Sequence, residues 1–350
     1  MTRRAAIWAV PCAMLWLTSA AAAQDNVGAF YKGKTLDMIV SSGVGGGQDA
    51  NARLIARHWP RHIPGAPNMV VKNMPGAGHL RAANFMANQA PKDGTVIAAL
   101  VPSFVLSQVL QTSKGIQFDA AAFNWIGASA ANNSTFYVWS TSPVKTMDDA
   151  TRRETLMGAT GAGSYTMIYP AIMNAIVGTK FKIVAGYKST NEVSLALERG
   201  EVEGRAGNNF NSLKMENGDW LRDRKIRLIA QVGLERDPEF PDIPLMMEFG
   251  KTPEDKALLK LFSADIAVGR PFLTSPGVAA DRVEALRRSF MGTMADATFL
   301  KEAEAGNVEV APVPGEKLQK VVADIVATPP DIARRAREAL AGFEGGSAPK

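Results

Sequence analysis

The sequence is poor in the side chains on which most catalytic and metal sites are built. Its 350 residues include one cysteine, Cys12, and three histidines, His58, His62 and His79. Because Cys12 lies in an N-terminal segment that we expect to be removed on export, the mature chain would have no disulfide, thiol nucleophile or thiolate metal ligand. No His-Glu-x-x-His motif occurs, and Pro60 interrupts any helix that would bring His58 and His62 together. The sequence therefore predicts neither a metal nor a cofactor.

A large excess of charge of one sign is also missing. Lysine and arginine number 39 against 34 aspartates and glutamates, and loss of Arg3 and Arg4 would reduce the excess from five to three. No basic run occurs, so the chain lacks the footprint of a nucleic-acid-binding protein. Residues 161–165 have glycine and serine in the wrong order for a Gly-x-Ser-x-Gly elbow, and no histidine follows His79 to serve as a base in the second half. We therefore expect a binding protein and not an enzyme.

Signal-peptide features occupy the first 23 residues. Arg3 and Arg4 precede an apolar stretch, residues 5–17, and three alanines form a small-residue cleavage site before Gln24. This order is typical of a signal peptide, so we expect cleavage after Ala23 and a periplasmic mature protein. A retained membrane anchor is the alternative, which the short apolar stretch disfavours.

Glycine, in contrast, is concentrated directly after predicted strands. Residues 36–40 are typical of a strand, residues 41–48 contain four glycines, and residues 49–57 are typical of a helix. Glycine allows positive φ, and a helix that begins at such a loop points free N–H groups and the positive end of its dipole at an anion. A tight turn that binds nothing is the alternative. Gln48 stands where a dinucleotide fingerprint needs its third glycine, and no Gly-Lys-Ser/Thr ends the loop, so both nucleotide motifs are excluded.

The same strand, loop and helix unit recurs along the first third of the chain. A second strand at residues 68–72 leads into a loop, residues 73–78, and a helix at 79–88. Residues 95–100 form a continuous apolar run of the kind found in buried parallel strands, followed by a third loop at 101–104. Alternating strands and helices predict a parallel sheet, whose ligands lie beyond the carboxyl ends of the strands. All three loops can therefore line one cleft.

A second α/β unit follows, and the chain then returns to the first. Strands are predicted at residues 134–140, 156–159, 181–184 and 226–232, with a glycine-rich turn at 160–166. Residues 261–268 are strand-like and would lead back into the first unit, where residues 281–296 have the apolar spacing of an amphipathic helix.

The chain resembles the extracytoplasmic receptors of tripartite tricarboxylate transporters, the Bug or TctC-like family, through several motifs. The most specific is Asn73-x-Pro75-Gly76-Ala77-Gly78. Others are Tyr31-x-Gly33-Lys34, Pro91-x-Asp93-Gly94-Thr95 and Asp242-Ile243-Pro244. The chain departs from the family pattern at Ser42 and Val44, where proline is usual, and at Met74, where arginine is usual.

The resemblance implies an α/β fold of the type II periplasmic binding protein topology. Two doubly wound α/β domains would be joined by two crossing strands, with a ligand cleft between them. The first domain would comprise residues 26–128 plus 263–350, and the second residues 129–262. Members of the family capture small organic carboxylates and deliver them to membrane transport subunits. For this chain the resemblance implies a monomer that binds a mono-, di- or tricarboxylate, aromatic acids included.

The resemblance also implies which residues bind the ligand. In the first domain these are the two glycine loops and a neighbouring serine: Gly45, Gly46, Gly47, Gly76, Ala77, Gly78 and Ser103. In the second domain they are Ser164, Tyr165, Thr166, Tyr187 and Asn208. Two other functions stay open: a carboxylate receptor that signals through a sensor partner, and a secreted α/β hydrolase. The sequence does not name the ligand.

Overall fold

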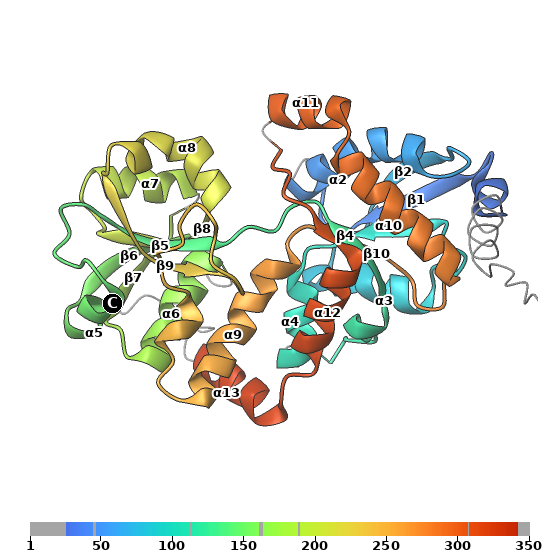
Figure 1. Cartoon of the computed structure of the whole chain (residues 1–350). Helices are drawn as coiled ribbons and strands as arrows, with labels where there is room; N and C mark the ends of the chain where they lie inside the picture. Colours follow the sequence, from blue (N-terminus) through green and yellow to red (C-terminus); the bar gives the residue numbers. More distant parts are fainter. Residues whose placement is uncertain are drawn as a thin grey trace, which may run out of the picture.

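The computed structural model describes residues 26–44, 47–111, 114–160, 164–187, 190–306 and 308–341. The predicted signal peptide, Gly45 and Gly46 lie outside these ranges. The described chain forms two α/β lobes, each built on its own sheet (Figure 1). No helix in the described part is long and apolar enough to cross a membrane.

The first lobe is built on a six-stranded mixed sheet. β1 lies between β2 and β3 and is parallel to both, as the alternation of strands and helices predicts. β10 returns from the C-terminal third of the chain and pairs antiparallel with β3 and β4. In sheet order the strands are β11 (Val313–Pro314), β4 (Asn124–Ala128), β10 (Pro271–Thr274), β3 (Val96–Ala99), β1 (Thr35–Val40) and β2 (Asn68–Asn73).

Helices cover both faces of this sheet, because its strands are apolar on both sides. On one face Ile39 and Ala98 share an apolar cluster with residues of α3, α4 and α12. On the other face Met38 and Ile97 share a second cluster with residues of α2, α10 and α11. These helices are α2 (Gly47–His58), α3 (Leu80–Asn88), α4 (Ser103–Leu110), α10 (Ala280–Met294), α11 (Ala297–Ala305) and α12 (Gly315–Val326), with the 3₁₀ turns η1 (Trp59–His62), η2 (Ala77–His79) and η3 (Ala120–Ala122).

The second lobe is built on a five-stranded sheet with α6 on one face and α7 and α8 on the other. Phe136 packs with Tyr169 of α6, whereas Tyr137, its neighbour in β5, packs with Trp220 of α8. In sheet order the strands are β7 (Phe181–Ala185), β6 (Thr155–Ala159), β8 (Gly204–Asn209), β5 (Ser134–Trp139) and β9 (Ile226–Val232). The helices are α5 (Met147–Arg152), α6 (Tyr165–Val177), α7 (Thr190–Glu198) and α8 (Phe210–Arg222), with the 3₁₀ turn η4 (Met246–Phe249).

Three stretches of chain meet where the lobes join. Arg270 N–H donates to Ala130 O at 2.8 Å, and Ser129 N–H donates to Arg270 O at 3.0 Å. Ala311 N–H donates to Ser129 O at 3.0 Å, and Ala130 forms a bridge with Ala311. We call residues 129–131, 269–270 and 311 the hinge. Gly269 is required here because a Cβ would lie 2.0 Å from Ala130 O, and its φ of +62° is unfavourable for other residues.

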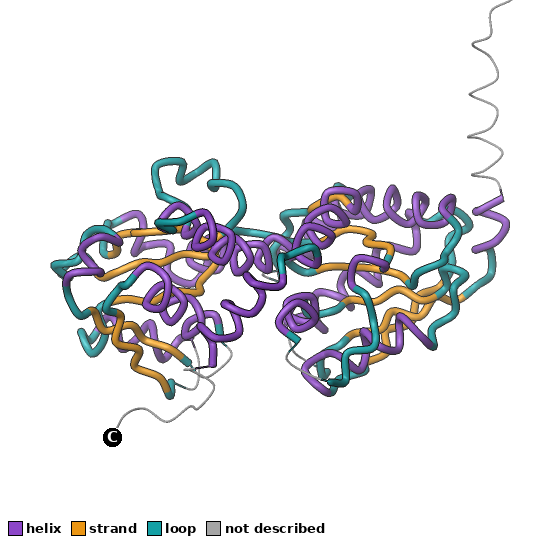
Figure 2. Tube along the Cα trace, turned by 90° about the horizontal axis from the view of Figure 1, so that it is seen from below, coloured by secondary structure: helices purple, strands orange, loops and turns teal. Residues whose placement is uncertain are grey.

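Two helices reinforce the junction beside the hinge. α9 (Pro253–Val268) and α13 (Pro330–Ala341) lie below the loop that connects β4 to β5 in Figure 1, between the lobes. Phe262 of α9 and Ile332 of α13 belong to the same apolar cluster as Phe104 of the first lobe and Tyr169 of the second. Figure 2 shows the lobes side by side with helices between them.

The predicted strand at residues 261–268 is wrong, since these residues end the helix α9. The helix begins with a capping box, in which Asp255 N–H donates to Thr252 Oγ1 at 3.1 Å and Thr252 N–H donates to Asp255 Oδ2 at 3.2 Å, and Pro253 occupies its first turn. The returning strand is β10, ten residues later in the chain than the predicted one began. The position 262/263, where the sequence predicts a domain boundary, lies inside α9.

Candidate functional site

The three loops that follow β1, β2 and β3 meet at one edge of the first sheet. The parallel register places Val40 beside both Asn73 and Ala99. Ser41, which is buried, joins all three loops: its Oγ accepts from Val101 N–H at 3.0 Å, and its carbonyl oxygen lies 3.0 Å from His79 Nδ1. The prediction that these loops share one edge is thus supported by direct contacts between them.

Asn73 ties the first two loops together and explains the first position of the Asn-x-Pro-Gly-Ala-Gly motif. Its Nδ2 donates to Ser42 O at 3.0 Å and to Asp49 Oδ1 at 2.8 Å. Arg53 completes the cluster by donating to Asn73 Oδ1 at 2.7 Å and to Asp49 Oδ2 at 2.9 Å. Asp49 lies in the first turn of α2, where the helix dipole favours an acid.

The second glycine loop is conformationally strained. Gly76 has φ +131°, and two residues with side chains, Ala77 and His79, have φ of +48° and +75°. Left-handed backbone at residues other than glycine costs free energy and occurs most often at functional sites. The loop leads into η2 and only then into α3, so the helix begins one residue later than the sequence predicts.

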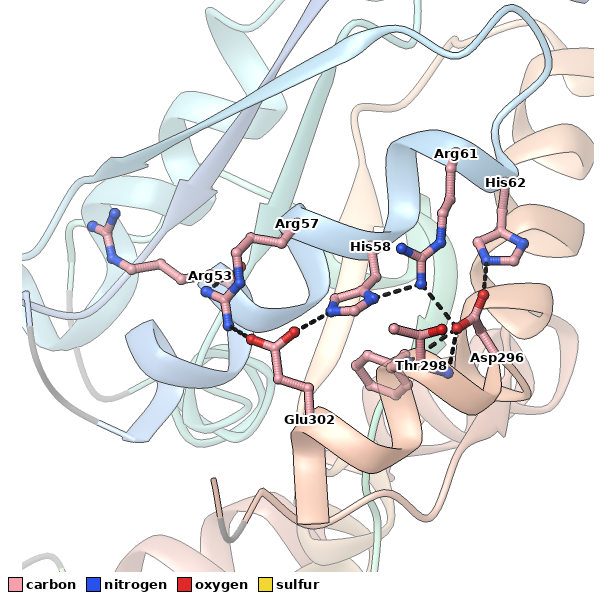
Figure 3. A network of polar contacts seen from close by, with 9 residues as sticks. Arg53, Arg57, His58, Arg61, His62, Asp296, Thr298 and Glu302 are labelled. Carbon is pink, nitrogen blue, oxygen red and sulfur yellow. Dashed lines mark hydrogen bonds and ion pairs between the residues drawn. The ribbon is translucent and has the colours of Figure 1, made fainter. Parts of the chain in front are cut away.

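α2 is also clamped at its C-terminal end, as Figure 3 shows. Arg57 and His58 both contact Glu302 of α11, His58 Nε2 at 2.5 Å from Glu302 Oε2. Arg61 donates to Asp296 at 2.8 Å, and His62 Nε2 lies 3.0 Å from the same carboxylate. Donation from backbone N–H groups, above all that of Phe299, together with Arg61 and His62, lowers the pKa of Asp296. These ion pairs fix the C-terminal end of α2 and the η1 turn that follows it.

A pocket of about 210 Å³ lies at the junction of the lobes. It is lined from the first lobe, from the second lobe and from two of the three hinge stretches. The lining residues are Pro102, Ala130, Asn132, Ser134, Tyr165, Gly207, Asn209, Asp265, Ile266, Gly269, Arg270 and Glu309.

One cationic and two acidic side chains line this pocket. The guanidinium of Arg270 makes no ion pair or hydrogen bond with the described residues. Asp265 is 3% exposed, and its Oδ2 accepts from the Tyr165 hydroxyl at 2.5 Å. Burial raises the pKa of Asp265, and burial together with the nearby Asp265 carboxyl raises the pKa of Tyr165. The other acid, Glu309, is only half-buried.

The predicted residues of the first lobe lie around the glycine loops. Gly47 is the first residue of α2, Gly76 precedes η2, and Ala77 and Gly78 lie within η2. Ser103 is the first residue of α4, directly after Pro102 of the pocket wall.

The predicted residues of the second lobe are spread around the start of α6 and two strand ends. Tyr165 lines the pocket. Thr166 Oγ1 accepts from Thr160 N–H at 3.1 Å and lies 2.7 Å from Ser164 Oγ, so these hydroxyls hold the turn before α6. Tyr187 is half-buried against the α7 face. Asn208 is 3% exposed in β8, between the pocket residues Gly207 and Asn209.

Sequence reasoning missed several pocket residues, among them Asp265, Arg270, Asn132 and Asn209. The sequence predicts a strand at residues 261–268, which misplaces Asp265 and leaves Arg270 in an ordinary loop, although the Thr252 capping box signals a helix start. The other two follow β4 and end β8, and no local motif distinguishes them from ordinary turn residues.

The model of the tripartite tricarboxylate transporter family receptor, TctC, matches residues 53–335. The chain belongs to this family. Its members are receptors that bind solutes, and the family is not one of enzymes. A curated relative, the UPF0065 protein in the gbd 5′ region of Cupriavidus necator, is 27% identical over 224 residues. This match covers 62% of the chain and 64% of the relative, so the chain aligns with less than two thirds of that protein.

Several solved structures share the fold. A TctC solute-binding protein from Polaromonas, determined without ligand, gives a TM-score of 0.67 at 19% identity, over 87% of this chain and 99% of that one. MatC of Rhodopseudomonas palustris with bound malate gives 0.54 at 17% identity, over 86% and 99%. Rpa4515 of the same species with adipate gives 0.54 at 19%, over 87% and 97%. These likenesses confirm the periplasmic binding protein fold predicted from the sequence.

Proposed function

We propose that this chain is a periplasmic receptor that captures a small organic carboxylate and delivers it to the membrane subunits of a tripartite tricarboxylate transporter. The observation that carries the proposal is a polar pocket between two lobes, which contains a cation, Arg270, whose guanidinium has no partner among the described residues. The glycine loops after β1 and β2 supply a second source of anion binding through amide groups near the start of α2 and around η2. The ligands of MatC and Rpa4515, malate and adipate, are of the same chemical class.

In this proposal the ligand carboxylate lies against the amide groups of the glycine loops. Charge-assisted hydrogen bonds from amides and from Arg270 are stronger than those between neutral groups, so few are needed. Asn73 and Ser41 hold the loops in register, and the residues of the second lobe contact the remainder of the ligand. Closure of the lobes about the hinge would then exclude water from the pocket.

Calorimetry of the purified mature chain tests the proposal. We expect one site for at least one member of a panel comprising acetate, succinate, adipate, citrate and benzoate, and no binding of succinamide, the neutral counterpart of succinate. Arg270→Gln should weaken carboxylate binding by about tenfold or more. Arg222→Gln is the matched control, because Arg222 is exposed and paired with Asp223 outside the pocket. Failure of the whole panel to bind would contradict the proposal.

Delivery to membrane subunits needs its own test. Cells that lack this receptor but keep the transport subunits should lose uptake of the identified acid, and the intact gene should restore it. Unchanged uptake, combined with a normal affinity in vitro, would favour the signalling receptor instead.

A further inference from the structure

A second hollow lies behind the hinge, between the same two lobes as the pocket. It has a volume of about 420 Å³ and separates residues 234–238 of the second lobe from α12 of the first. We call it the rear groove. Ala130, which forms a strand bridge, lines the pocket, whereas the next residue, Ala131, lines the rear groove. Successive residues of an extended chain point to opposite sides, so the two hollows lie on opposite sides of the hinge.

The wall that the second lobe contributes is held firmly to its sheet. Gln231 of β9 is fully buried, and its Nε2 donates to Phe240 O at 3.0 Å and to Ile243 O at 2.7 Å. Its Oε1 accepts from Asp237 N–H at 2.8 Å. Because one buried side chain binds three points of this loop, residues 234–238 move with the second lobe.

The opposite wall, α12, belongs to the first lobe. Its residues Leu318 and Val322 are fully buried in the apolar cluster that also contains Phe104 of α4. Lys317 and Val321, their neighbours in sequence, line the rear groove. The width of the rear groove therefore depends on the angle between the lobes. Because the pocket and the rear groove lie on opposite sides of the hinge, a rotation that narrows the pocket widens the rear groove.

Two features of the walls favour a narrow rear groove. Lys317 Nζ lies 3.8 Å from Glu235 Oε1, so an ion pair crosses from one lobe to the other, and widening the groove would separate its charges. Leu234 and Val321 line the groove from opposite walls, and both are only half-buried. Narrowing the groove would remove more of their apolar surface from water, which is favourable. Both features therefore oppose closure of the lobes over the pocket.

We propose that the rear groove controls the angle between the lobes: contacts across it stabilise the open form and so lower the affinity of the pocket for its ligand without touching that ligand. A protein that binds only in its closed form has an apparent affinity reduced by the fraction of molecules that are closed. Lys317 and Glu235 thereby become determinants of affinity, although neither lines the pocket. The effect on affinity rests on the proposed function, whereas the control of the lobe angle does not.

Charge reversal at Lys317 tests the inference. Lys317→Glu places two carboxylates on opposite walls of the rear groove, and their repulsion should widen it. Nitroxide labels on Glu284→Cys of the first lobe and Glu239→Cys of the second, both exposed and outside the groove, report the distance between the lobes by double electron–electron resonance. The mature chain without Cys12 has no other cysteine to label. We expect a longer distance in the ligand-free variant and, in calorimetry with the carboxylate panel above, binding that is about threefold tighter, the size set by an exposed ion pair.

Two variants serve as controls. Adding Glu235→Lys to the Lys317→Glu protein restores opposite charges across the groove and should restore both the wild-type distance and the wild-type affinity. Lys145→Glu makes the same change in net charge at an exposed position outside the rear groove. It should leave the distance unaltered and should not tighten binding, because a more acidic protein attracts an anion less. High salt should remove the effect of Lys317→Glu, since it screens exposed charges.

The possible outcomes separate this inference from the proposed function. An unchanged distance in Lys317→Glu would refute control of the lobe angle by the rear groove. A longer distance with unchanged or weaker binding would show that widening the groove does not favour closure over the pocket, which also overturns the inference. A longer distance in a protein whose wild type binds no acid of the panel would support control of the lobe angle and refute the proposed function.

Discussion

The hinge offers the sharpest test of how the two lobes are joined. Gly269 has φ +62° and ψ −133°, a conformation essentially restricted to glycine, and a side chain there would cost about 1–3 kcal/mol. The added Cβ would also lie 2.0 Å from Ala130 O, the acceptor of the Arg270 N–H bond. Displacing Ala130 would break or weaken that hydrogen bond and the hydrogen bond between Ser129 and Arg270 beside it. Each contributes about 1 kcal/mol to stability. We expect Gly269→Ala to reduce the free energy of unfolding by about 3 kcal/mol or more.

Gly178→Ala is the matched control for this substitution. Gly178 ends α6 with φ +82°, and a Cβ there would meet nothing within 4 Å. It therefore bears the conformational cost alone, about 1–2 kcal/mol for left-handed backbone. Urea unfolding followed by circular dichroism gives both values from the midpoints and slopes. The reasoning about the hinge is refuted if the two variants lose the same stability, because the clash and the two hydrogen bonds would then contribute nothing.

Three further predictions concern binding, acid stability and export. Ala77→Asp should abolish carboxylate binding in calorimetry while the circular dichroism stays native, since the new charge repels the anion; near-native affinity would place the carboxylate outside the second glycine loop. The pKa values of Asp296 and Glu302 are lowered in the folded protein, so their stabilisation is present above their unfolded pKa values and is lost as the pH falls below about 4. Asp296→Asn should lower the melting temperature at pH 7 and flatten its decline below pH 4, and an unaltered profile would argue that the ion pairs with the η1 turn do not stabilise the protein. Mass analysis of the periplasmic protein should show a chain beginning at Gln24, and a mature chain that retains Cys12 would contradict signal-peptide cleavage.

The parts of the fold predicted from sequence are those specified by local signals. β1, β2 and β3 are short strands, the first two of which end in glycine loops, and their pairing follows from the alternation with helices. α9 was mistaken because residues 258–268 are apolar on several sides, so their spacing does not distinguish a buried helix from a buried strand. β8 contains two glycines and two asparagines within six residues, so its sequence does not predict a strand. It is a strand because it pairs with β5 and β6.

Only the first half of the proposed site carries signals in the local sequence. Glycine and a helix start suffice to predict an anion site at the two glycine loops, and this site stays a prediction. Asp265 and Arg270 reach the pocket because of the way the chain is folded. Asp265 lies in the last turn of α9, and Arg270 directly precedes β10, which returns to the first sheet. Nothing within a few residues of either distinguishes them from surface charges. Their role depends on Tyr165 and Ala130, more than 90 residues away in sequence, which no local pattern reveals.

The pocket and the hinge share residues, and this connects ligand binding with the movement of the two lobes. Ala130, Gly269 and Arg270 belong to both, so a ligand that engages the Arg270 side chain acts on a residue whose backbone joins the lobes. Asn51 of α2 extends the link, because its side chain hydrogen-bonds Ser129 Oγ at 3.0 Å and so couples the glycine-loop helix to the hinge. A ligand can shift the balance between open and closed forms only by its difference in affinity for them. In the proposed function, a ligand held by both the glycine loops and the second lobe can make all of its contacts only when the lobes approach. Such a ligand would therefore favour the closed form.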